Sequence, residues 1–170
     1  MYRFLLVVLF MPAVVPAFAQ WNIQNTGTNA PLFSLSQLGD QWLAGSVGAV
    51  LYSDNNGASW EERELRDPIS NLPIAAGVRC TKLLGPQSGI VSGTFFLGNT
   101  QMVAASNDAF QSLGIIPINS GGGYPRLLND WSFPQPGTGF ACGSNYSLVK
   151  TTDNGQSWTL ANNSGIELFG

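Results

Sequence analysis

The stretch that decides the fold is Thr151–Trp158, TTDNGQSW, which has a close copy in Ser53–Trp60, SDNNGASW. Both copies follow one template: Ser or Thr, any residue, Asp or Asn, any residue, Gly, any residue, Ser, Trp. A third copy lies between them in Ser106–Leu113, SNDAFQSL, with Phe110 in place of the glycine and Leu113 in place of the tryptophan. One polar turn written three times, at intervals of 53 and 45 residues, indicates an internal repeat.

Each residue type in this polar turn has a structural reason. The Asp or Asn side chain accepts hydrogen bonds from nearby backbone N–H groups, as in an Asx turn. Glycine takes the positive φ of a tight hairpin, and tryptophan brings a large apolar area into the next strand. Phe110 must either adopt an unfavourable φ or belong to a turn of another shape, so we expect the middle repeat to be the most irregular. The predicted structural residues are Ser53, Asn55, Gly57, Ser59, Trp60, Ser106, Asp108, Ser112, Thr151, Asp153, Gly155, Ser157 and Trp158.

Calcium is the rival explanation for a turn rich in Asp, Asn and Gly. An EF-hand loop needs its first oxygen ligand five residues before its glycine, and these positions hold Tyr52 and Lys150. Neither side chain can serve. We therefore expect a structural turn with no metal site, and we expect no cofactor.

The text upstream of the turns also repeats. A glycine stands eight residues before each first Ser or Thr, within WLAGS (42–46), FFLGN (95–99) and FACGS (140–144), and a short apolar segment follows each. A period of about 40–50 residues with several short strands per unit is typical of a β-propeller blade. We predict an all-β chain of about three blades at roughly 30–65, 75–118 and 125–165. A leading strand is predicted at 21–25, because WNIQNTG from Trp21 resembles WTLANNSG from Trp158.

The N-terminal residues have the pattern of a secretory signal peptide. Residues 1–19 contain one basic residue, Arg3, then an apolar run and the small-x-small sequence Ala17-Phe18-Ala19. The run is interrupted by Pro12 and Pro16 and is shorter than the roughly 20 residues of a membrane span. We expect cleavage near Ala19 and an exported chain 20–170 in the periplasm, at the cell surface or secreted. No later segment is long and apolar enough to span a membrane.

Composition excludes several classes of function. The chain has 7 Lys and Arg against 10 Asp and Glu, an acidic balance that argues against nucleic acid as a partner. It has no histidine, which excludes His-dependent triads and most zinc sites. Cys80 and Cys142 either form a disulfide in an oxidising compartment or are buried separately as small apolar residues.

The polar turns resemble the Asp-box, or bacterial neuraminidase repeat. The phrases AGSVGAVLYSDNNGASW and GFACGSNYSLVKTTDNGQSW look most like the photosystem II assembly and stability factor family of propellers. The resemblance covers Trp21 to about Gly165 and implies a non-enzymatic scaffold that binds protein partners. In such families the Asp-box lies at the blade periphery, away from any active site.

Catalytic relatives such as sialidases clamp a substrate carboxylate with converging arginines. This chain offers only scattered candidates, Arg63, Arg66, Arg79 and Arg126. The acidic run Glu61, Glu62, Glu64 and Asp67 is interpreted as a solvated outer strand and loop. We therefore name no catalytic residue. The alternative is a sialidase-like or other glycoside hydrolase fragment with catalytic residues elsewhere, and a third is a surface adhesive.

Two further expectations concern partners. The Gly-rich loop NSGGGYPR, 119–126, presents Tyr124 and Arg126 as candidates for binding a protein or a glycan, and a plain interblade connection also explains it. Propellers have about four to eight blades, so three turns indicate an incomplete ring. Further blades of a longer protein, or self-association, would complete it.

Overall fold

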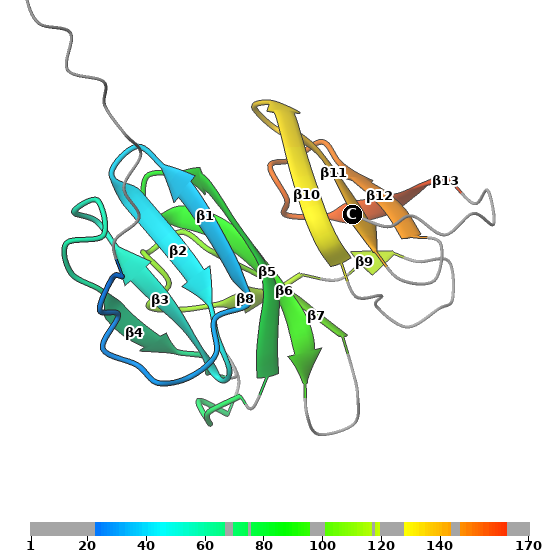
Figure 1. Cartoon of the computed structure of the whole chain (residues 1–170). Coiled ribbons are helices and arrows are strands. Elements are labelled where there is room, and N and C mark those ends of the chain that lie inside the picture. Colours follow the sequence, from blue (N-terminus) through cyan, green and yellow to red (C-terminus); the bar gives the residue numbers. More distant parts are fainter. Residues whose placement is uncertain are drawn as a thin grey trace, which may run out of the picture.

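The computed structural model describes residues 23–66, 70–74, 76–95, 101–116, 118–119, 128–143 and 147–162. In these residues the chain forms β-strands, without a helix, arranged in three sheets (Figure 1). The predictions of an all-β fold and of about three repeated sheets are confirmed. Within the described part of the chain, no helix is long and apolar enough to cross a bilayer.

The first two sheets each have four antiparallel strands in chain order. The first contains β1 (Ser34–Leu38), β2 (Gln41–Gly45), β3 (Ala49–Ser53) and β4 (Glu61–Glu64). The second contains β5 (Ala76–Gly85), β6 (Ser88–Phe95), β7 (Gln101–Ser106) and β8 (Gly114–Ile115). The third contains β10 (Leu128–Gln135), β11 (Thr138–Gly143), β12 (Ser147–Thr151) and β13 (Trp158–Asn162), with β9 (Ile118–Asn119) added in parallel to β13.

Each sheet has two different faces. Side chains alternate along a strand, so residues paired across two strands lie on the same face. In the first sheet Ala44 pairs with Leu51 on the face that carries Ser53, the first residue of the polar turn, whereas Leu43 pairs with Tyr52 on the other face. We call the face with the first Ser or Thr of the turn the turn face, and the opposite face the back face.

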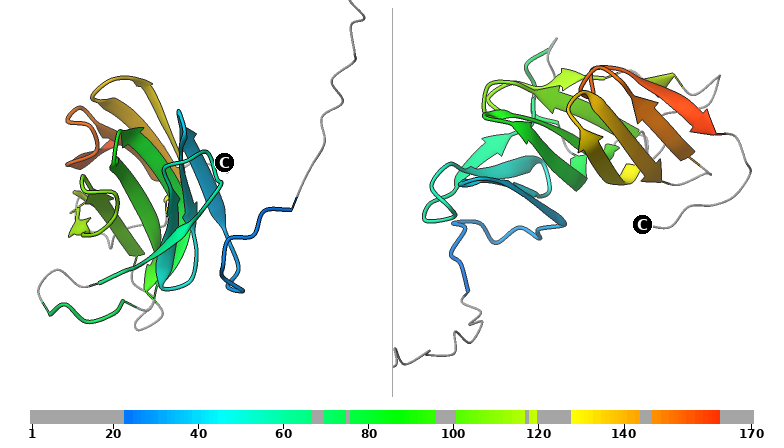
Figure 2. Two further views of the ribbon diagram at one scale, coloured as in Figure 1. Left: turned by 90° about the vertical axis from the view of Figure 1, so that its left-hand side faces the viewer. Right: turned by 90° about the horizontal axis from the view of Figure 1, so that it is seen from above.

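The three sheets stack in one direction, the back face of each against the turn face of the next. Seen from above, they follow one another as segments of an open ring (Figure 2). Burying each large apolar side chain contributes about 1.5–3 kcal/mol, so the two junctions are the main apolar contribution to stability. The first junction contains Leu43, Val50, Tyr52, Val78, Leu83, Val91, Ala104, Phe110 and Leu113. The second contains Cys80, Ile90, Val103, Leu128, Trp131, Ala141, Val149 and Trp158.

Buried hydroxyl groups fix the sheets relative to each other. The Thr81 hydroxyl donates to the Leu43 carbonyl at 3.3 Å across the first junction. The Ser92 hydroxyl donates to the Leu128 carbonyl at 2.7 Å across the second. Both side chains are about nine-tenths buried or more. Because a buried hydroxyl is costly without a partner, each bond favours one relative position of its two sheets.

The predicted leading strand is wrong over residues 23–25, which belong to no strand. Residues 21 and 22 lie outside the described part of the chain. Ile23 is fully exposed, at 102% of its reference area. A strand needs a partner for its backbone groups, and in the described residues no sheet edge pairs with this segment.

The upstream match of the middle repeat is also wrong in detail. In the other repeats the residue opposite the first Ser or Thr is Trp42 or Gly139, near the start of the second strand. Ser106 likewise lies opposite the second residue of its strand, Gly89, but Phe95, which corresponds to Trp42 and Phe140 in the repeated sequence, lies at the far end of β6. Phe95 therefore has a different place in its strand, and its match with Trp42 and Phe140 does not hold in space.

Candidate binding cleft and the polar turns

The hydroxyl that opens each polar turn organises the whole loop. It accepts a hydrogen bond from the backbone N–H four residues later, at 3.0 Å for Ser53, 2.9 Å for Ser106 and 2.9 Å for Thr151. It also donates to the Asn or Asp two residues later, at 2.9, 2.7 and 2.6 Å. The same bonds occur in all three turns despite their different sequences, so the template encodes a conformation.

The Asp or Asn closes the turn from its other side. The Asp153 carboxylate accepts from the Ser157 N–H at 2.9 Å and from the Ser157 hydroxyl at 2.5 Å. Hydrogen bonds from Ser157, then from Thr151, lower the pKa of Asp153 to about 2. For Asp108 partial burial opposes ionisation, but hydrogen bonds from Ser112 and Ser106 outweigh it and lower the pKa. In the first turn Asn55 accepts from the Ser59 N–H and donates its amide N–H to the Ser59 hydroxyl.

Phe110 keeps the middle turn in the same shape by adopting a positive φ of 64°. The glycines at this position, Gly57 and Gly155, have φ of 80° and 85°. The Phe110 ring is 2% exposed and packs 6.3 Å from the Tyr52 ring, centroid to centroid. Burial of the ring thus offsets a backbone conformation that L-residues avoid.

The closing tryptophans have different surroundings in the first and third turns. Trp158 is 1% exposed, packs against Trp131 and Phe133, and donates its indole N–H to the Gly155 carbonyl at 3.1 Å. Trp60 remains partly exposed on the turn face of the first sheet, and its buried Nε1 has no hydrogen-bond partner among the described residues. The difference follows from position, because a preceding sheet covers Trp158 and none among the described residues covers Trp60.

A backbone bond also joins every polar turn to the hairpin between the first two strands of its own sheet. The N–H of Asn56 donates to the Asp40 carbonyl, that of Ala109 to Gln87, and that of Asn154 to Gly137, at 2.7–2.9 Å. The three donors all have φ between 57° and 60°. The polar turns and these hairpin tips therefore lie at one end of the molecule.

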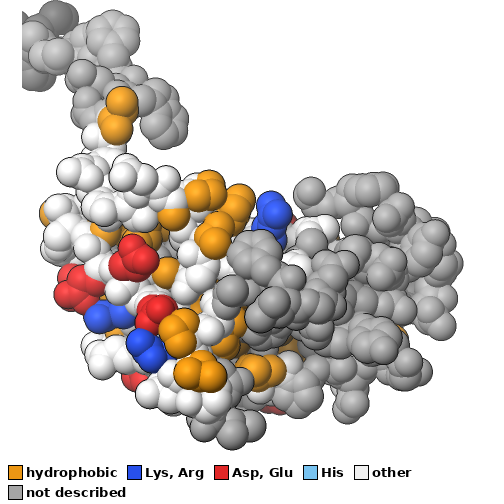
Figure 3. Space-filling model, turned by 90° about the horizontal axis from the view of Figure 1, so that it is seen from below, with side chains coloured by type: hydrophobic (Ala, Val, Ile, Leu, Met, Phe, Trp, Pro, Cys, Tyr) orange, Lys and Arg blue, Asp and Glu red, His pale blue; other side chains and the backbone are white. Residues whose placement is uncertain are grey.

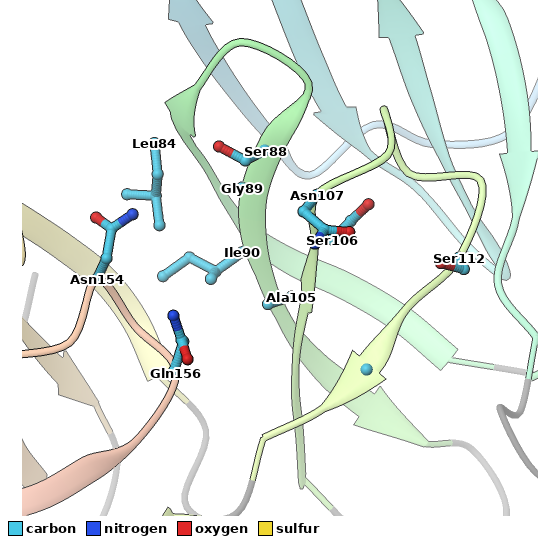
Figure 4. A pocket seen from close by; sticks show the side chains of 11 residues that line it. Leu84, Ser88, Gly89, Ile90, Ala105, Ser106, Asn107, Ser112, Asn154 and Gln156 are labelled. Carbon is cyan, nitrogen blue, oxygen red and sulfur yellow. The ribbon is translucent and has the colours of Figure 1, made fainter.

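Small cavities recur where a polar turn meets the preceding sheet. One of about 380 Å³ lies between the second sheet and the third turn, where Asn154 and Gln156 reach toward Leu84 and Ile90 (Figure 4). Another of about 300 Å³ lies between the first sheet and the second turn, with Gln111 in the place of Gln156. Because both junctions form such a cavity, we interpret it as a consequence of stacking the repeats.

A larger cleft of about 670 Å³, here called the inner cleft, opens at the same end of the molecule. It differs from the other cavities in being lined by all three sheets, near the ends of the innermost strands β1, β5 and β10. Leu38 on its wall is 42% exposed, and Lys82 is the one charged lining residue. The lining consists of Gln37, Leu38, Lys82, Leu83, Leu84, Phe133, Pro134, Gln135, Pro136, Gly137 and Asn154.

The cleft wall from the third sheet is held rigidly. Phe133 packs edge-on against Trp158, with ring centroids 6.0 Å apart and planes at 83°. Gly139 permits this position, because a Cβ there would lie 2.5 Å from the Phe133 ring. The wall from the second sheet is tied to the first by the Leu83 N–H, which donates to the Ser36 hydroxyl at 3.2 Å. The cleft is therefore largely pre-formed.

The described arginines do not converge on one point. Arg63 pairs with Glu61, and Arg66 with Glu64, both on the first sheet and its exit. Figure 3 shows acidic and basic side chains next to one another on the side of the molecule formed by this sheet. Arg79 instead lies over the Phe33 ring, 4.5 Å from its centroid. Each of these arginines thus has its own local partner, unlike a carboxylate clamp.

The two cysteines are free thiols in the second and third sheets. Burial, followed by the nearby Asp130 carboxylate, raises the pKa of the Cys80 thiol to about 12. The same two causes, in the same order, raise the pKa of Cys142. Tyr124, Arg126 and Asp67 lie outside the described residues, so their predicted roles stay predictions.

Sequence reasoning did not select the residues of the inner cleft. The available signal was the hairpin tip, since Gly39 and Gly137 both stand 14 residues before the first residue of a polar turn and both have positive φ. Such a signal locates a hairpin. It does not reveal that tips from different sheets meet around one cleft.

Three stacked sheets, repeated turns and a cleft at the inner strand ends define an incomplete β-propeller. Solved structures of this fold resemble the chain. A structure described as YCF48 bound to D1 peptide has a TM-score of 0.65 at 18% identity over 93% of this chain and 49% of its own. YCF48 from Cyanidioschyzon merolae has a TM-score of 0.64 at 16% identity, over 84% and 43%.

A GH74 xyloglucanase from Xanthomonas campestris is also similar, with a TM-score of 0.59 at 11% identity over 77% of this chain and 23% of its own. The chain thus spans about half the length of the YCF48 structures it matches. No family model matches the sequence, and no curated protein matches it. The likeness therefore establishes the fold.

Proposed function

We propose that this chain is an exported, non-enzymatic propeller scaffold that binds an extended segment of a partner protein in the inner cleft. Its polar turns act as Asp boxes that stabilise the sheets, and of their residues only Asn154 also lines the cleft. The observation that carries the proposal is the cleft itself, about 670 Å³ in volume and lined by three sheets with one cation among apolar and amide side chains.

The chemistry of the lining indicates what would bind. Leu38, Leu84 and Phe133 offer apolar contacts, and the backbone and amide groups of the Pro134–Gly137 tip offer hydrogen bonds. Lys82 favours a carboxylate on the ligand. An extended peptide with apolar side chains and one acidic group fits this combination. The structure described as YCF48 bound to D1 peptide supports the class of ligand, because a protein of this fold holds a peptide.

Panning a random-peptide display library against the full chain tests the proposal. Enriched peptides should combine an acidic group with apolar residues. Lys82→Glu and Leu38→Asp should each weaken their binding by roughly tenfold or more in fluorescence anisotropy. Leu72→Asp is the matched control, because Leu72 is 64% exposed and does not line the cleft. Enrichment of no peptide, or equal binding by all variants, would refute the proposal.

The second candidate is a piece of a glycoside hydrolase, favoured by the likeness to the GH74 xyloglucanase. The two carboxyl groups with shifted pKa values, Asp108 and Asp153, are shifted downwards, the opposite of what a general acid requires. Neither carboxyl group is therefore suited to be the general acid, which this candidate places elsewhere. Release of reducing ends from xyloglucan, or of a fluorogenic group from sialosides, would favour this candidate over the scaffold.

A further inference from the structure

The same two positions on the back face of each sheet are apolar in all three sheets. The first position lies on the second strand, paired with the residue that precedes the polar turn, and holds Leu43, Ile90 or Phe140. The second position lies on the third strand, three residues before the first Ser or Thr of the turn, and holds Val50, Val103 or Leu148. In the first two sheets these four side chains are 0–2% exposed, because the next sheet covers them. Phe140 and Leu148 are only partly buried, since no further sheet follows among the described residues.

The turn face of the first sheet also carries apolar side chains that no other described sheet covers. At the two junctions within the chain this face is covered, and its closing residues Leu113 and Trp158 are 7% and 1% exposed. In the first sheet Trp60 and Trp42 are partly exposed and Leu35 is 59% exposed. The described residues thus leave one back face and one turn face uncovered, the two kinds of surface that pack together twice within this part of the chain.

We propose that a second copy of this chain covers both surfaces. The back face of β10–β13 in one copy docks on the turn face of β1–β4 in the other, and the reciprocal contact closes the pair. Each contact continues the stacking seen at the two internal junctions. Two copies bring together six sheets, within the range of about four to eight blades in closed propellers. A twofold axis between the two copies makes the two contacts equivalent and closes the pair.

The oligomeric state of the full chain, expressed from Met1 and purified as the host delivers it, tests this inference. Light scattering after size exclusion should give twice the mass of one chain. Leu35→Glu and Phe140→Glu should each raise the dissociation constant of the pair by about 100-fold or more, because each replaces an apolar contact with a charged side chain that must lose its water. Leu72→Glu, at an equally exposed leucine away from both faces, should remain paired.

Mixing the two variants separates this contact from a symmetric one. The Leu35→Glu copy keeps an intact back face and the Phe140→Glu copy an intact turn face, so an equimolar mixture should form a hetero-pair in native mass spectrometry. Circular dichroism and a cooperative melt show that both variants fold. A wild-type monomer, an open-ended polymer, or a Phe140→Glu variant that stays paired would overturn the proposal. None of these outcomes bears on peptide binding in the inner cleft.

Discussion

At the scale of single residues, one hydroxyl group holds each polar turn in its conformation by donating one hydrogen bond and accepting another. Ser53, Ser106 and Thr151 each donate to the Asp or Asn two residues on and accept from the backbone four residues on. These bonds are local, so a segment of eight residues encodes them completely. The turn therefore tolerates replacement of its glycine by Phe110 and of its tryptophan by Leu113.

Asparagine should substitute for Asp153 at little cost. Asn55 makes the equivalent bonds in the first turn, with its amide N–H donating to the serine hydroxyl. We expect Asp153→Asn to lower the free energy of unfolding by less than about 1 kcal/mol, and Asp153→Ala by about 1–3 kcal/mol, because it leaves the buried Thr151 hydroxyl without its acceptor. Urea unfolding at neutral pH measures both. Equal losses for the two variants would contradict the prediction.

The same substitution should change the response to acid. The pKa of Asp153 is lowered to about 2 in the folded chain. A lowered pKa adds stability that is present above the unfolded value of about 4 and is lost as the pH falls through the folded value. In Asp153→Asn this part of the acid dependence, between about pH 4 and pH 2, should vanish. Asp108 should keep its own contribution and serves as an internal control.

Phe110 should show an unusual order of substitutions. Its φ is 64°, a region that costs an L-residue about 1–2 kcal/mol, and its buried ring contributes about 3–5 kcal/mol relative to alanine. Both Phe110→Ala and Phe110→Gly lose the ring, but only glycine relieves the backbone. We therefore expect Phe110→Gly to be the more stable of the two by about 1 kcal/mol in thermal unfolding. A more stable Phe110→Ala would contradict the backbone argument.

Thiol reactivity should differ between the two cysteines. Cys80 is 6% exposed with a pKa raised to about 12, so it stays protonated and covered near pH 8. Cys142 is partly exposed with a raised pKa. In the native chain a thiol reagent should label Cys142 slowly and spare Cys80, and Cys142→Ser should abolish labelling. Absence of any thiol in the unreduced, denatured chain would instead demonstrate a disulfide.

At the scale of strands, a small residue in the second strand makes room for an aromatic ring. Gly139 lies opposite Thr151, and a Cβ on it would meet the Phe133 ring at 2.5 Å. Gly89 has the same position opposite Ser106, and a Cβ on it would meet the Lys82 carbonyl oxygen at 2.4 Å and the Phe110 ring at 2.8 Å. Aromatic packing and strand register are therefore coupled.

Gly139→Ala should destabilise the chain by about 1–3 kcal/mol, because the Phe133 ring must leave its contact with Trp158. Phe133→Leu in the same chain should recover part of this loss, since leucine is smaller at the point of collision. A double-mutant cycle in urea measures the coupling. Additive effects of the two substitutions would show that the glycine serves another purpose.

The strands also show what sequence reasoning could and could not supply. The polar turns could be predicted because the side-chain bonds within each turn join residues two or four positions apart. The true register of the middle repeat could not be predicted, because β6 extends to Phe95, which therefore does not lie where Trp42 and Phe140 lie in their strands. The inner cleft was unreadable for a related reason: Leu38, Lys82 and Phe133 come from three sheets whose placement depends on interblade packing.

At the scale of the whole molecule, the N-terminal residues bear on where the chain works. Residues 1–19 have the charge, apolar run and Ala17-Phe18-Ala19 pattern of a signal peptide. Expression in a bacterial host should yield a periplasmic product whose intact mass is that of a chain starting at Gln20. Ala19→Pro should block processing and leave the precursor at the membrane. An unprocessed product in the cytoplasm would contradict export.

Because the sheets stack in one direction, a gene of this kind can gain a repeat by duplication without creating a new type of contact between sheets. Every sheet packs its turn face against the preceding sheet and its back face against the following one. A duplicated unit spliced in between residues 66 and 76, where the first sheet gives way to the second, would find both of its sides occupied and would leave the two extremities unchanged. Copy number can thus change by whole units at little structural cost, and descendants of one ancestor can differ in length while keeping identical joints.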